Sequence, residues 1–146
     1  MSATSLVTKA WEIEGEADEF AEQIHKDVDR FLPGIRIHGI DILWAAFQHA
    51  GKTRAGIIVP PSFQKESGIQ GMVGLILKVG PEIGTRPELL EHFAGDLPKV
   101  GDWAVIDTRY GIKFIMGGGG GREGRHIRII ESKLIYALIA RPDWII

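Results

Sequence analysis

The sequence predicts a mainly β fold, in which an N-terminal helical extension at residues 1–34 is followed by a small β-barrel domain at residues 35–146. Two observations lead to this prediction. Near the N-terminus, apolar residues recur at three- and four-residue spacing, which is typical of an amphipathic helix. After residue 34, short β-branched runs alternate with turn residues and no long helical pattern separates them, which is typical of a small barrel or sandwich.

The N-terminal helix is predicted over about residues 14–31, and Pro33 and Gly34 end it because proline resists continuation and glycine allows the chain to reverse. Eight acidic residues between Glu12 and Asp29 surround one apolar stripe, which is too long to stay in water. The stripe consists of Ile13, Phe20, Ile24, Val28 and Phe31. It packs either on the chain's own barrel or on another protein, in which case the helix is a docking element with its acidic side toward a basic surface.

The strands are predicted in six segments, several of which show period-two alternation of apolar residues. In chain order they are residues 35–47, 72–80, 102–110, 111–116, 126–132 and 134–140. The long connection between the second and third segments includes PELLEHFAG, residues 87–95, for which one or two helical turns are predicted.

Composition narrows the class of protein. The chain of 146 residues has the length of one domain, with 45% hydrophobic residues and a formal net charge of -2, so the overall charge favours neither nucleic acid nor an anionic membrane as a partner. Cysteine is absent, which excludes disulfides, thiolate nucleophiles and Cys-ligated zinc. The N-terminus lacks the features of a secretory signal, and no apolar run approaches the roughly 18 residues of a membrane span. We therefore expect a soluble, cytoplasmic protein.

The glycine-rich run at residues 117–121 gives a nominal dinucleotide-binding pattern, because Gly119, Gly121 and Gly124 satisfy G-x-G-x-x-G. That motif needs a following helix whose N-terminus holds the pyrophosphate, whereas the strand-like HIRIIES follows here. We therefore predict a hairpin tip between the fourth and fifth strands. The basic residues beside it are interpreted as a solvated surface rather than a phosphate or nucleic-acid site. They are Arg122, Arg125, His126 and Arg128.

The sequence contains no pattern of an active site or a metal centre. Its five histidines are widely scattered and show none of the short His/acid spacings of metal sites. Asp41, Asp102 and Asp107 are not accompanied by a catalytic motif such as G-x-S-x-G or H-E-x-x-H. We expect a protein that is not an enzyme and that uses neither a metal nor a cofactor.

Four pieces of the chain, between about Ile35 and Ile139, carry a resemblance to a known family. In order they are IRIHGIDILWAAF, TRAGIIVPP, KVGDWAVIDTRYGIKF and IRIIESKLIYALI. They resemble the first strand, the mobile loop, the central hairpin and the closing segment of GroES-type co-chaperonins, in a divergent form of the kind that phages carry. The resemblance implies that the barrel is GroES-like.

The resemblance also implies a function. An aliphatic tripeptide in the family's loop enters a groove of a chaperonin ring, which assigns partner binding here to Gly56, Ile57, Ile58, Val59 and Pro60. In the family, seven subunits close a ring in which the first and last strands of neighbours meet, so we expect a homo-oligomer, heptameric if that pattern holds. The other interpretation of the tripeptide is that it fills this protein's own core or a neighbour's surface.

The chain also departs from the family, and these departures leave a second function open. Residues 1–34 precede the first strand, and the loop carries Pro60, Pro61 and Phe63 in place of small polar residues. The alternative function is that of a decoration or cement protein of a phage capsid, which reuses the GroES-like fold. In that case the N-terminal helix and the apolar tail RPDWII dock on the capsid shell, and the protein belongs to the virion.

Overall fold

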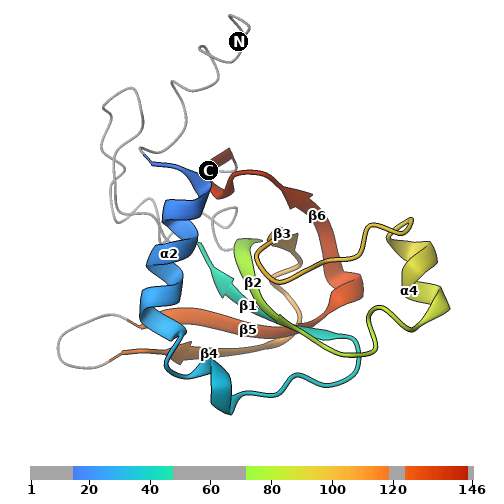
Figure 1. Ribbon diagram of the computed structural model, residues 1–146, viewed down its shortest axis with the longest axis horizontal. Helices are drawn as coiled ribbons and strands as arrows, with labels where there is room; N and C mark the ends of the chain where they lie inside the picture. The colour runs from blue at the N-terminus through green and yellow to red at the C-terminus, as the bar shows by residue number, and fades with distance from the viewer. Residues whose placement is uncertain (1–14, 48–71, 119–123, 145–146) are drawn as a thin grey trace, which may run out of the picture.

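The computed structural model describes residues 15–47, 72–118 and 124–144 (Figure 1). Within them the protein is mainly β, as the sequence predicts, with a six-stranded antiparallel sheet and two α-helices. The strands are β1 (Asp41–Ala46), β2 (Val73–Val79), β3 (Trp103–Ile106), β4 (Ile112–Met116), β5 (Arg125–Glu131) and β6 (Ile135–Ile139). The helices are α2 (Ala17–Val28) and α4 (Pro87–His92), and short 3-10 turns lie at Leu32–Gly34, Ser132–Leu134 and Pro142–Trp144.

The strands are hydrogen-bonded in the order β4-β5-β1-β2-β3-β6, and each neighbouring pair is antiparallel. β4 and β6 lie at the two edges of this sheet and are not paired with each other in the described residues. The sheet is therefore open, and the predicted closure into a barrel is not confirmed. The predicted β4–β5 hairpin is confirmed because Met116 lies opposite Arg125, whereas its tip at residues 119–123 lies outside the described residues.

The central strands β1, β2 and β3 are buried on both faces, and alternate residues of one strand enter two separate hydrophobic cores. We call these two sides the α2 face and the α4 face, after the helix that contributes to each core. In β1, Leu43 and Ala45 belong to the α2 face, while Ile42 and Trp44 belong to the α4 face. Burial on both sides explains why β1 is a continuous apolar run rather than an alternation of polar and apolar residues.

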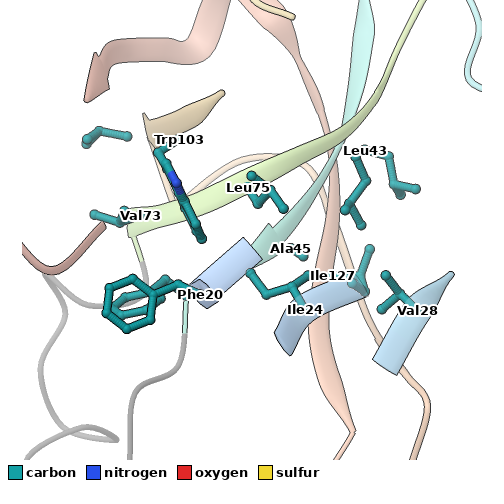
Figure 2. Close-up of a cluster of buried hydrophobic side chains, with 12 residues drawn as sticks. Phe20, Ile24, Val28, Leu43, Ala45, Val73, Leu75, Trp103 and Ile127 are labelled. Atoms are coloured by element: carbon teal, nitrogen blue, oxygen red, sulfur yellow. The ribbon is translucent and has the colours of Figure 1, made fainter. Parts of the chain in front are cut away.

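Helix α2 packs against the sheet, and three residues of its apolar stripe are part of the core of the α2 face (Figure 2). Phe20, Ile24 and Val28 are at most 5% exposed, and they share this core with strand residues such as Leu75 and Ile127. For these three residues the stripe packs on the chain's own sheet, which is one of the two interpretations that the sequence allowed. These three side chains do not present a free docking surface.

The helix is shorter than the predicted residues 14–31. Acids in its first turn favour its start, because negative charge compensates the helix dipole there. After Val28 the chain passes into the 3-10 turn at Leu32–Gly34, where proline prevents the helix from continuing. Of the remaining predicted stripe residues, Phe31 is partly buried beyond the helix end, and Ile13 lies outside the described residues.

Charged groups join both ends of helix α2 to distant parts of the chain. Arg125 of β5 donates to Asp27 with an Nη2–Oδ2 distance of 2.8 Å. At the helix start, the guanidinium of Arg141 donates to the carbonyl oxygen of Gly15 at 2.9 Å and to the Glu16 carboxylate at 3.2 Å. The N-terminal helix is therefore attached to the C-terminal turn as well as to the sheet.

Candidate partner-binding surfaces

The predicted partner-binding loop belongs to the connection between β1 and β2. Its residues, including Gly56, Ile57, Ile58, Val59 and Pro60, lie in the segment 48–71, outside the described residues. The residues on either side of this segment are described and lie together, because the Phe47 N–H donates to the Val73 carbonyl oxygen at 2.8 Å. The segment therefore leaves and re-enters the fold at a single hydrogen-bonded point.

The base of this connection is firmly packed. The Phe47 ring is 4% exposed and makes edge-to-face contacts with Phe20 and Trp103, at centroid distances of 5.3 and 5.8 Å. Aromatic pairs in this geometry add about 0.5–1.5 kcal/mol beyond the burial of their area. Helix α2 thus contributes directly to the site from which the connection starts.

The two edge strands present apolar side chains to solvent. Ile112 and Ile115 of β4 are 68% and 63% exposed, and Tyr136 of β6 is 62% exposed. Edge strands also carry backbone groups that no neighbouring strand satisfies, and proteins usually cover or protect such edges. β4 and β6 are therefore the parts of the described sheet best suited to meet another chain.

The predicted first strand, residues 35–47, is in the sheet only from Asp41 onward. β1 is paired on one side with β2 and on the other with β5, so residues 41–46 have no edge left for a neighbouring subunit. The preceding residues 35–38 of the predicted first strand belong to no strand and no ladder of the described sheet.

A cluster of charged and phenolic side chains lies where the β3–β4 turn approaches β6. Asp107, which is 5% exposed, accepts hydrogen bonds from Arg109 Nε at 2.9 Å and from Arg109 Nη2 at 2.7 Å. The Tyr136 hydroxyl donates to the same carboxylate at 2.7 Å. The outer side of the cluster is exposed, and the Arg109 guanidinium lies 5.5 Å from the centre of the Tyr110 ring. Tyrosine and arginine are enriched in the energetically important centres of protein interfaces.

Hydrogen bonds from Arg109 and Tyr136 hold the pKa of Asp107 well below its ordinary value of 3.8. The carboxylate in turn raises the pKa of Arg109 and that of Tyr136. The sequence suggested no such group, because 29 positions separate Asp107 from Tyr136 and only the pairing of β3 with β6 brings them together. The short Asp-Thr-Arg spacing was the one visible signal for the ion pair.

Asp107→Asn is expected to destabilise the protein at neutral pH. A carboxyl whose folded-state pKa is depressed stabilises the fold above its ordinary pKa, and this contribution is lost as the pH falls toward the folded-state pKa. The difference in urea midpoint between wild type and variant should therefore be constant at neutral pH and shrink below about pH 4. Asp96→Asn, which removes an exposed charge, is the control and should leave the urea midpoint at neutral pH nearly unchanged. A pH-independent difference for Asp107→Asn would contradict the assignment.

The basic residues beside the glycine run are not the solvated cluster that the sequence predicted. Arg125 pairs with Asp27 on the α2 face, and Arg128 lies on the opposite face of β5 with an exposure of 7%. His126 is exposed, and Arg122 lies outside the described residues. The interpretation of Arg128 as a surface charge is wrong, because residues 125 and 128 alternate to different sides of a strand and Arg128 continues along the α4 face.

Comparison with known proteins adds no family to these observations, because neither a protein-family model nor a curated protein matches the chain. Within residues 15–47, 72–118 and 124–144, no group of three or more His, Asp or Glu side chains could hold a metal ion. In the same part of the chain, none of the helices combines the length and the hydrophobicity needed to cross a membrane.

Proposed function

We propose that this protein is a divergent co-chaperonin-like subunit that binds a chaperonin ring through its β1–β2 connection. The observation that carries the proposal is the closure of that connection at its base, where Phe47 and Val73 are hydrogen-bonded. A long segment that starts and ends on a packed hairpin base can present a short apolar motif without disturbing the sheet. The aliphatic tripeptide of the family-like loop, Ile57, Ile58 and Val59, lies within this segment.

The energetics of such a loop favour an assembly over a single subunit. Burial of three aliphatic side chains contributes roughly 5–8 kcal/mol, whereas ordering about ten loop residues costs on the order of 10 kcal/mol. One loop alone would therefore bind weakly. Several loops on one homo-oligomer would bind together, because the first contact raises the effective concentration of the others.

The two edges of the sheet support the homo-oligomer. β4 and β6 both expose apolar side chains, and neither has a second strand neighbour in the described part of the chain. A ring of subunits would cover edge strands of this kind through contacts between neighbours. The family resemblance implies seven subunits in the ring, and this number is part of the proposal.

The capsid alternative receives less support. Its docking element was the apolar stripe of the N-terminal helix, and the stripe residues Phe20, Ile24 and Val28 are buried in the chain's own core. Of the apolar tail, Trp144 is 52% exposed, and residues 145–146 lie outside the described part. No further contact of the described residues favours this function.

Ile58→Asp is expected to weaken binding to a double-ring chaperonin, in the presence of adenine nucleotide, by about tenfold or more. Loss of one buried isoleucine costs about 2 kcal/mol, and a carboxylate in an apolar groove adds a desolvation cost. Binding is measured by co-migration of the two proteins on a sizing column. Sedimentation and thermal unfolding check that the variant keeps the assembly and the fold of the wild type.

Val100→Asp is the matched control, since it places the same charge on a side chain that is already 56% exposed. It should bind like the wild type. The proposal is contradicted if the wild-type protein does not co-migrate with the chaperonin. It is also contradicted if Ile58→Asp loses its thermal transition, because the tripeptide would then belong to the protein's own core.

A further inference from the structure

Arg128 is a buried cation without a carboxylate partner in the described part of the chain. It is 7% exposed, and its one hydrogen bond runs from Nη1 to the carbonyl oxygen of Tyr110 at 2.7 Å. Its Nε is buried and has no hydrogen-bond partner. Desolvation lowers the pKa of Arg128, which reflects the cost of removing the charge from water. Such a group in a native protein calls for an explanation, and an ion is one of the common ones.

The surroundings of Arg128 do not neutralise this charge. On one side its strand neighbour is Trp44 of β1, and on the other it is Lys113 of β4. Residues directly opposite each other in an antiparallel pair lie on the same face of the sheet, so the exposed Lys113 has its side chain on the same face as Arg128. Like charges in this arrangement are destabilising unless something lies between them. The acid of the adjoining turn, Asp107, is already bound by Arg109 and Tyr136.

On the α4 face, strands β1, β4 and β5 carry no acidic residue next to Arg128 and Lys113. Apart from Arg128 and Lys113, the residues of this face are apolar in β1 and are isoleucine or histidine in β4 and β5. They are Ile42, Trp44, Ala46, Ile115, His126 and Ile130. A β-carbon at Gly111, where φ is +86°, would lie 3.2 Å from Arg128 Cγ, so glycine leaves the space that the arginine side chain occupies.

We propose that Arg128 and Lys113 form a binding site for a phosphate-type dianion. The Tyr110 carbonyl occupies Nη1, and Nε is buried without a hydrogen-bond partner. An oxyanion that enters beside the edge formed by Nε and Nη2 would accept two parallel hydrogen bonds from it. The Lys113 ammonium supplies the second positive charge, and a phosphate group carries about 1.5 to 2 negative charges at pH 7. The pair therefore matches phosphate better than a singly charged carboxylate. This inference does not depend on the proposed chaperonin function.

The test is thermal unfolding of the full chain in inorganic phosphate at constant ionic strength. For a dissociation constant of about 1 mM, phosphate at about 10 mM should raise the Tm of the wild type by about 4 °C relative to chloride. Sodium acetate at the same ionic strength should raise it by less, since it carries one charge. Arg128→Met and Lys113→Met should each lose the phosphate-dependent increase, whereas Arg36→Met, which removes an exposed charge elsewhere, should keep it.

Arg128→Met is expected to fold, because replacing a buried unpaired charge by an apolar side chain of similar length is often neutral or stabilising. If it does not fold, Lys113→Met decides, since its side chain is exposed. The proposal is overturned if the phosphate-dependent increase survives in Lys113→Met or in a folded Arg128→Met. It is equally overturned if chloride, acetate and phosphate give the wild type the same Tm. Glycerol phosphate in place of phosphate distinguishes a site for the free ion from one for a phosphate ester, and either response supports the site.

Discussion

A chain that lacks residues 1–34 is expected to lose its cooperative thermal transition. Removal of helix α2 exposes the core of the α2 face and withdraws Phe20, Ile24 and Val28 from it. Each such side chain contributes about 1.5–3 kcal/mol by burial, so together they approach the total stability of about 5–15 kcal/mol of a typical domain. Near-UV circular dichroism and binding of a hydrophobic dye measure the loss of packing. A truncated protein that unfolds as sharply as the full chain would show that the helix is an appendage.

A pair of point variants separates this effect from the loss of chain length. Ile24 is 1% exposed in the middle of the helix, so Ile24→Ala should cost about 2–5 kcal/mol through lost burial and the cavity left behind. The neighbouring Gln23 is exposed, and Gln23→Ala should change the stability by no more than about 0.5 kcal/mol. Equal urea midpoints for the two variants would contradict the packing of α2 on the sheet.

Local patterns in the sequence were sufficient to predict the helix and the strands. The spacing of Phe20, Ile24 and Val28 identifies one helical face, and β-branched runs bounded by glycine and proline identify the six strands. The predicted first strand began too early. At Gly39 the backbone φ is +59°, and the carbonyl of this residue accepts a hydrogen bond from Glu82 rather than from a strand neighbour. The ladder therefore starts only at Asp41, a boundary that depends on contacts distant in the sequence.

Closure of the sheet and the environment of single charges were beyond the reach of the sequence. Whether β4 and β6 pair depends on the curvature of all six strands, which no local pattern encodes. In the sequence Arg128 is one of several arginines near a predicted hairpin tip. Its burial depends on its position opposite Trp44 in the ladder and on its hydrogen bond to the carbonyl oxygen of Tyr110, and neither is visible in the sequence. Because side chains alternate along a strand, the sequence alone does predict that Arg125 and Arg128 lie on opposite faces of β5.

Gly74→Ala is expected to cost about 3 kcal/mol or more, because the structure leaves no space for a methyl group in the middle of β2. A β-carbon at Gly74 would lie 2.3 Å from the carbonyl oxygen of Ala45 and 2.3 Å from the indole ring of Trp44. The first of these atoms belongs to the backbone of the adjacent strand and cannot move without breaking the ladder. The measurement is the free energy of unfolding in urea.

The reason for this glycine is the position of Trp44. Its indole lies over β2 at Gly74 and donates from Nε1 to the carbonyl oxygen of Ala104 on β3, at 3.2 Å. Gly74 lies directly opposite Ala104 in the ladder, so the ring crosses one strand to reach the next. Gly84→Ala is the matched control, since the nearest atom to a β-carbon there is 4.0 Å away, and it should leave the stability nearly unchanged. If both variants unfold at the same urea concentration, the ring does not lie across β2. Because loss of the ring relieves only one of the two close contacts, Gly74→Ala should cost less in a Trp44→Leu background but should still be destabilising.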